Sequence, residues 1–144
     1  MDTKKQKLRP SLELIKITPN PERVKSILHM ANLLEERITL QDKEKMAALV
    51  TVDYYEIIKE LLTAILLLEG YKTLSHKSLI AYLEKNYNAA FGKDEFILMD
   101  DTRKLRNDIL YYGKQVDKSF LINHEGRLKI IISKLLNMVN KKSQ

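Results

Sequence analysis

The sequence of 144 residues contains no cysteine and no tryptophan, and it has only four glycines and three prolines. Without cysteine the chain can form no disulfide, no Cys-ligated zinc or iron–sulfur site and no cysteine nucleophile, so a cytoplasmic location is the default expectation. The scarcity of glycine and proline, with 44% hydrophobic and 31% charged residues, excludes collagen-like, low-complexity and largely disordered chains. The length predicts one folded domain.

Long hydrophobic runs are also missing. The longest one, residues 61–68, is bounded by Glu60 and Glu69. It falls far short of the ~20 residues that a membrane helix needs, so we expect no membrane partner. The basic residues near the N-terminus are followed by no apolar segment of the kind that a secretory signal requires.

The net charge of +6 is concentrated at the two ends of the chain. Residues 1–10 carry +3 and residues 141–142 carry +2, which leaves +1 for the rest. A nearly neutral body argues against a broad surface for polyanions. Basic ends usually serve solubility, although they would strengthen any phosphate contact made elsewhere.

Helical periodicity dominates the chain after a short N-terminal arm, which we place at residues 1–18, with an extended stretch at 12–17. Asn20, Pro21 and Glu22 supply an N-cap, a first-turn proline and a first-turn acid, and these open a first helix. A long central helix is expected over residues 42–69, ended by Gly70, and a third helix begins after Ser75. Two more are expected over residues 94–113 and 123–140.

No segment predicts a strand. The sequence therefore predicts an all-α, five-helix up-and-down bundle over residues 19–144, in which neighbouring helices pack antiparallel. The central helix is apolar around much of its circumference from Tyr54 onward, as expected of an element buried on most sides. We expect four residues at its centre: Ile58, Leu62, Ile65 and Leu66.

Most catalytic signatures are absent. The four glycines form neither a dinucleotide fingerprint nor a phosphate-binding loop. His29, His76 and His124 are too scattered for a helical metal pair, so we expect no metal and no cofactor.

The helix expected at 94–113 carries an unusual polar face. At 100° per residue, its core stripe is predicted to contain Leu98, Leu105, Ile109 and Tyr112. The opposite face would present Arg103, Arg106, Asn107 and Tyr111, with Met99 and Leu110 among them. A face covered by a partner that also binds an anion would use all of these side chains. Alternatively, the two arginines pair with aspartates of the same helix and the Tyr111 side chain extends along the surface.

This helix carries a resemblance to a known family. The run Arg103-Lys-Leu-Arg-Asn-Asp-Ile-Leu-Tyr-Tyr112 follows helices containing Val52-Asp-Tyr-Tyr-Glu56 and Gly70-Tyr-Lys-Thr-Leu-Ser-His-Lys77. Over residues 20–140 this order resembles the HEPN family of small helical bundles. The resemblance implies a homodimer, and a metal-independent endoribonuclease that acts as the toxin partner of a minimal nucleotidyltransferase antitoxin. Its Arg-Asn pair falls on Arg106 and Asn107.

The sequence departs from the family pattern at Tyr111, where the resemblance leads us to expect a histidine. Tyrosine, with an unperturbed pKa near ~10, is a poor base at pH 7, so a weak or inactive enzyme is plausible. Arg106 could still bind phosphate, and Tyr111 could hydrogen-bond it or stack on a base. The resemblance thus implies Arg106, Asn107 and Tyr111 as catalytic residues.

Three further residues are candidates for binding: Arg103, Tyr112 and His76. His76 has a competing structural role in capping or packing. Two functions stay open, an RNA- or nucleotide-directed HEPN-like module and a helical interaction protein with no nucleic-acid activity.

Overall fold

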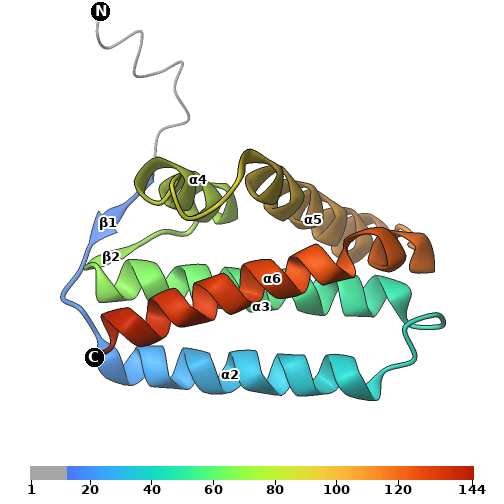
Figure 1. Cartoon of the computed structure of the whole chain (residues 1–144), viewed down its shortest axis with the longest axis horizontal. Helices are drawn as coiled ribbons and strands as arrows, with labels where there is room; N and C mark the ends of the chain where they lie inside the picture. The colour runs from blue at the N-terminus through green and yellow to red at the C-terminus, as the bar shows by residue number, and fades with distance from the viewer. Residues whose placement is uncertain (1–12) are drawn as a thin grey trace, which may run out of the picture.

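The computed structural model describes residues 13–144 and contains five helices joined by short connections (Figure 1). The elements are β1 (Ile15–Lys16), α2 (Pro21–Leu40), α3 (Ala47–Leu68), β2 (Tyr71–Lys72), α4 (His76–Asn86), α5 (Lys93–Tyr112) and α6 (Lys118–Lys142). The all-α, five-helix prediction is confirmed. Most of the arm expected at residues 1–18 lies outside the described residues.

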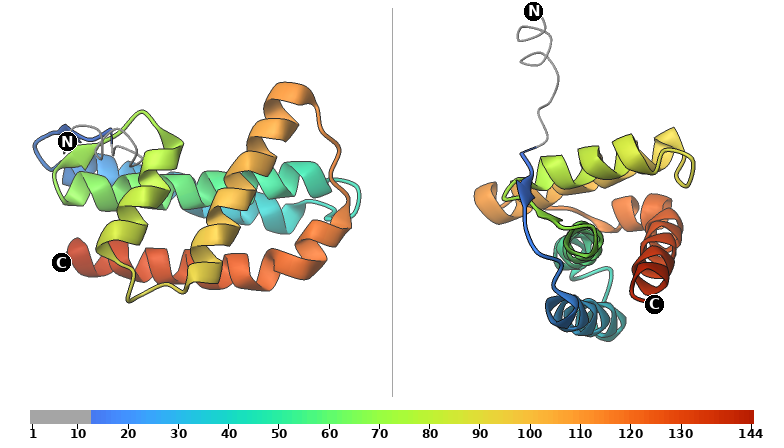
Figure 2. Two further views of the ribbon diagram at one scale, coloured as in Figure 1. Left: turned by 90° about the horizontal axis from the view of Figure 1, so that it is seen from above. Right: turned by 90° about the vertical axis from the view of Figure 1, so that its left-hand side faces the viewer.

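Helix α3 is the axis of the bundle. Figure 2 shows α2 and α6 along two of its sides, while α4 and α5 cover a third side. Helix α5 crosses α3 at a steep angle and its later part extends past it (Figure 2). Within residues 13–144, no helix has the length and apolar character needed to cross a membrane.

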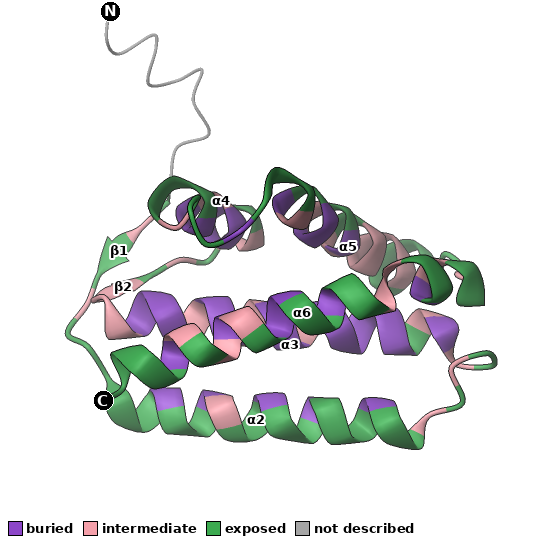
Figure 3. Cartoon of the chain, viewed as in Figure 1, coloured by how far each residue is buried: buried purple, intermediate pink, exposed green. Residues whose placement is uncertain are grey.

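The core is centred on α3, which is buried along most of its length (Figure 3). Ile58, Leu62, Ile65 and Leu66 are at most 1% exposed, so the predicted centre is confirmed. The helix is apolar on nearly every face because four other helices pack around it.

Local capping explains where the helices begin and end. The Asn20 side chain accepts a hydrogen bond from the Arg23 backbone N–H, and Ser75 does the same for Ser78, as predicted. Gly113 closes α5 in the left-handed conformation, with φ 66°.

Two helix starts differ from the prediction. Asp42 accepts backbone N–H bonds from Glu44 and Lys45 in a separate turn, so α3 begins only at Ala47. Asp117 caps α6, which therefore starts at Lys118, five residues before the predicted position.

The expectation that the chain contains no strand is wrong at one place. Residues 15–16 pair antiparallel with residues 71–72, with Ile15 opposite Lys72, and the Ile17 N–H donates to the Gly70 carbonyl at 2.9 Å. Gly70 has a φ of 87°, which favours glycine, and it turns the chain from α3 into β2. Only two residues of each segment pair, which is too short for an alternating apolar pattern to mark either strand in the sequence.

The predicted core stripe of α5 is partly wrong. Met99, expected on the outer face, is fully buried, whereas Tyr112, expected inside, is 81% exposed. Leu105 and Ile109 are only half-buried. The reason is the crossing geometry: α5 buries the side chains of its first half against the body, and its last turns extend beyond the body.

One carboxylate joins three helices at the end of α3. Glu69, the C-cap of α3, accepts hydrogen bonds from the hydroxyls of Tyr82 and Tyr87, at α4 and its C-cap, and forms a 2.6 Å ion pair with Lys142 of α6. Burial opposes ionisation of Glu69, but these three partners outweigh it and lower its pKa. We call these four residues the Glu69 clamp.

Candidate functional site

A group of polar side chains surrounds Arg106, where α5 passes over α3 near the start of α4. We call it the Arg106 cluster. Its members are Tyr55, Glu56 and Lys59 from α3, His76 from α4, and Arg103, Arg106, Asn107 and Tyr111 from α5.

Arg106 is the hub of this cluster. Its Nε donates to Glu56 Oε1 at 2.9 Å, and its Nη1 donates to Asn107 Oδ1 at 3.1 Å and to the Tyr111 hydroxyl at 3.4 Å. The side chain is only 12% exposed, although it stands on a polar face. Among residues 13–144, no hydrogen bond from Nη2 is present, so Nη2 is the one guanidinium nitrogen left for a ligand.

The alternative that both arginines pair on their own helix is half right. Arg103 Nε donates to Asp100 Oδ1 at 2.9 Å, three residues earlier on α5. Arg106 instead reaches across to Glu56 of α3, fifty positions earlier in the chain. Arg106 therefore joins two helices, and Arg103 supports its own helix.

The cations of the cluster are paired with carboxylates. Glu56 is shared between Arg106 and Lys59, whose Nζ lies 2.6 Å from Oε2. Burial opposes ionisation of Glu56, but the two cations outweigh it and lower the pKa of the carboxyl. Burial also disfavours the charged form of Arg106, but Glu56 and Tyr111 keep its pKa above the ordinary value. Lys59 Nζ also lies 3.5 Å from Glu60 Oε1, so Glu56 and Glu60 together balance Lys59 and Arg106.

Aromatic rings line the guanidinium of Arg106. Its Cζ lies 5.9 Å from the ring centroids of both Tyr55 and Tyr111. The Tyr55 side chain is fully buried, and its hydroxyl is the only buried side-chain polar atom in residues 13–144 without a hydrogen-bond partner. Burial raises the pKa of Tyr55, against the opposing charges of Arg103 and Arg106. A buried hydroxyl without a hydrogen-bond partner lowers the stability of the fold, and such groups are often found at functional sites.

His76 completes the cluster from the first position of α4. Its ring centroid lies 5.8 Å from that of Tyr55, so the imidazole and the Arg106 guanidinium both lie against the same ring. Burial lowers the pKa of His76, and the charges of Lys59 and Arg106 lower it further. The imidazole is therefore neutral at pH 7 and able to accept a proton.

The structure brings together five of the six residues singled out in the sequence. Arg106, Asn107 and Tyr111 are directly hydrogen-bonded, and Arg103 and His76 lie beside them. Tyr112 is not among them, because it is 81% exposed at the end of α5.

Sequence analysis missed three members of the site, Tyr55, Glu56 and Lys59. A signal for two of them was present: Glu56 and Lys59 form a charged i,i+3 pair in a mainly apolar helix whose other charged residues are Asp53 and Glu60. Charge that interrupts an apolar helix marks a position where a polar partner from another element must reach it.

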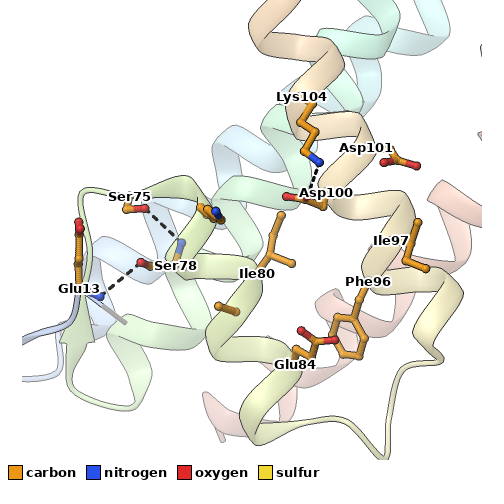
Figure 4. Close-up of a pocket in the computed structure, with 12 residues that line it drawn as sticks. Glu13, Ser75, Ser78, Ile80, Glu84, Phe96, Ile97, Asp100, Asp101 and Lys104 are labelled. Carbon is orange, nitrogen blue, oxygen red and sulfur yellow. Dashed lines mark hydrogen bonds and ion pairs between the residues drawn. The ribbon is translucent and has the colours of Figure 1, made fainter. Parts of the chain in front are cut away.

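A groove of about 560 Å³ lies next to the cluster, between α4 and α5 (Figure 4). Four of its lining side chains are acidic: Glu13, Glu84, Asp100 and Asp101. Its two lysines do not offset this charge, and Lys104 is already paired with Asp100 at 3.2 Å. The groove therefore repels phosphate, which leaves the Arg106 cluster as the better anion site.

Within the described residues, no group of three or more acidic or histidine side chains could hold a metal ion. Comparison of the sequence with models of known protein families finds no match, and a search of the curated proteins finds no similar sequence. The HEPN resemblance therefore rests on the residues that suggested it.

Proposed function

We propose that this chain is a HEPN-like module that binds RNA through the Arg106 cluster. The observation that carries the proposal is the contact set of Arg106, which is bonded to Asn107 and Tyr111 and still keeps donors open. The guanidinium is held in place by these neighbours, and the two N–H groups of its Nη2 are left to donate to a phosphate oxygen.

The neighbours of Arg106 suit the rest of a nucleotide. Asn107 fixes the guanidinium through its amide oxygen and leaves its own amide N–H groups available as donors. Tyr111 lies on the exposed side of the cluster, where its ring can stack on an unpaired base. These contacts favour a single-stranded RNA over a duplex, whose bases are already stacked.

The last turns of α5 also support the proposed homodimer. Leu110, Tyr111 and Tyr112 are all exposed there, on the part of α5 that extends past the body (Figure 2). A second copy, or the proposed nucleotidyltransferase partner, would cover this apolar surface beside Arg106. Light scattering distinguishes these arrangements, and a monomer at high micromolar concentration would contradict the homodimer.

Binding of a fluorescent single-stranded RNA in EDTA tests the proposed function. Arg106→Ala should weaken binding about tenfold or more, because a charge-assisted hydrogen bond to phosphate contributes about 1.5–3 kcal/mol. The salt dependence of binding should also fall by about one phosphate contact.

Arg23→Ala is the matched control, since Arg23 is an exposed arginine of α2 far from the cluster in sequence. It removes the same charge from the protein as Arg106→Ala. Equal effects of the two substitutions would show that binding depends on net charge alone and would contradict a site at Arg106.

One observation favours the second function, a helical interaction module without nucleic-acid activity. Glu56 already occupies the Nε side of Arg106 and competes with any phosphate. If the chain is such a module, neither the wild-type protein nor Glu56→Gln should bind RNA. If Glu56 only competes, Glu56→Gln should strengthen RNA binding.

A further inference from the structure

The groove between α4 and α5 has an apolar base and an acidic edge (Figure 4). Ile80 and Phe96 line it and are both only 6% exposed, whereas the lining residues Glu84 and Asp101 are exposed. Within residues 13–144, neither of these two carboxylates forms an ion pair. Such a groove suits a ligand that has both apolar and cationic side chains.

The chain itself meets this groove at Glu13. The Glu13 backbone N–H donates to Ser78 Oγ at 3.3 Å, and both residues line the groove. Figure 4 shows them side by side at one end of it. The pairing of Ile15 with Lys72 holds the next part of the chain against β2. Residues 1–12 lie outside the described residues, and they are attached to the body at this end of the groove.

The segment that precedes Glu13 has the chemistry that the groove suits. Residues 4–12 contain four cations, two leucines and no acidic residue. In an extended chain successive side chains point to opposite sides, so Leu8 and Leu12 would share one side and Lys7 and Arg9 the other. A segment of this kind can place apolar side chains on the base of the groove and cations along its edge.

We propose that the groove between α4 and α5 binds residues 4–12 of the same chain as an extended segment. Nine extended residues span about 30 Å, and the 11 residues of α4 span about 16 Å, so the segment is long enough to follow the groove. A short tether holds it near the groove at a roughly millimolar effective concentration. This gives the chain's own segment an advantage over a second copy or a separate basic peptide. The inference does not depend on RNA binding at Arg106.

Disulfide cross-linking tests the proposal cleanly, because the natural chain has no cysteine. Leu8→Cys is combined with Ala81→Cys, which lies in the groove. The matched control combines Leu8→Cys with Leu74→Cys, at a leucine that is 87% exposed and does not line the groove. Ala81 lies three positions after Ser78 and Leu74 four positions before it, so both are close to the point where the segment is attached.

Under mild oxidation the pair with Ala81→Cys should form an intramolecular disulfide at least about tenfold faster than the control pair, because a free tether would give the two targets similar effective concentrations. Adding Glu84→Gln and Asp101→Asn should slow the first pair several-fold and leave the control unchanged. Salt at about 1 M should act in the same way, because it screens charges beyond about 3 Å.

A second position guards against a folding defect. Ala81→Cys alone should keep the wild-type thermal unfolding midpoint, and Lys77→Cys, at an exposed lining residue of the same groove, replaces it if it does not.

Three results would overturn the proposal. Equal rates for the groove pair and the control pair would show that the segment does not bind the groove. Disulfide-linked dimers in place of the intramolecular product would assign the groove to the segment of a second copy. Fast cross-linking that is indifferent to salt and to the two carboxylates would show that charge complementarity does not hold the segment there.

Discussion

Four consecutive residues of α3 face two different environments. Asp53 and Tyr54 face α2 and α6, and every polar atom of their side chains has a partner. Tyr55 and Glu56 face α4 and α5, where the Tyr55 hydroxyl has no partner in the described residues and Glu56 is shared by two cations. On one side of the helix all side-chain polar atoms are therefore hydrogen-bonded, and on the other side some are not.

The two arginine–carboxylate pairs show the difference most clearly. Arg37 binds Asp53 through two parallel bonds of 2.9 and 2.7 Å, and Gln41 adds a third at 2.9 Å. Arg106 makes only one bond to Glu56 and uses another nitrogen for its own helix. Arg37 uses its paired donors to join α2 to α3, whereas Arg106 has a nitrogen, Nη2, without a hydrogen bond in the described residues. Polar groups without hydrogen-bond partners are typical of functional sites rather than of structural ones.

The largest expected effect comes from removing each arginine in turn. Arg37→Ala should lower the free energy of unfolding by about 1–3 kcal/mol, because the buried Asp53 carboxylate would keep only Gln41. Arg106→Ala should cost less than about 1 kcal/mol, because Lys59 still neutralises Glu56. Urea denaturation measures both. Equal losses would show that the two pairs serve the same structural purpose.

A smaller effect distinguishes the two adjacent tyrosines. Tyr54→Phe removes the hydrogen bond to Glu125 and should cost about 0.5–1.5 kcal/mol. Tyr55→Phe removes a buried hydroxyl without a partner and should cost nothing or stabilise the fold. Thermal unfolding of the two variants gives the comparison directly. A clear loss on Tyr55→Phe would mean that its hydroxyl has a partner in solution.

The smallest expected effect is on the free energy of unfolding at acidic pH. Burial opposes ionisation of Glu125, but hydrogen bonds from Lys43 and Tyr54 outweigh it and lower its pKa, as the cations do for Glu56. A carboxyl with a lowered folded-state pKa contributes stability above its unfolded pKa of about 4.3, and this contribution is lost as the pH falls through the folded value.

Glu125→Gln and Glu56→Gln should each make stability less dependent on pH below about 5, measured by urea denaturation. Glu84→Gln, at an exposed glutamate of α4 without an ion pair in the described residues, is the control. A variant that keeps the full wild-type slope would show that its carboxyl gains nothing from its partners on folding.

The sequence predicted the features that depend on neighbouring residues. Apolar spacing and caps at Asn20 and Ser75 predicted the helices, and apolar residues around much of the circumference predicted the buried centre of α3. The prediction of which α5 residues face the core was partly wrong. A helical stripe assumes uniform packing along the helix, whereas α5 contacts α3 only where the two cross.

Contacts between distant residues account for the rest of the site. The run 103–112 indicated Arg106, Asn107 and Tyr111, which are neighbours on one helix. Nothing local connects Glu56 to Arg106, or His76 to Tyr55, because those contacts arise from the way three helices cross. The RNA-directed function stays a prediction.

The Glu69 clamp has a consequence for how the molecule opens. Helix ends ordinarily fray one by one, and their amide hydrogens exchange with solvent independently. Here the last turn of α3, the C-terminal end of α4 and the last turn of α6 share one carboxylate, so opening any of them removes a partner from the other two. The three ends should therefore behave as one cooperative unit, with similar protection against hydrogen exchange, while the free end of α5 exchanges on its own.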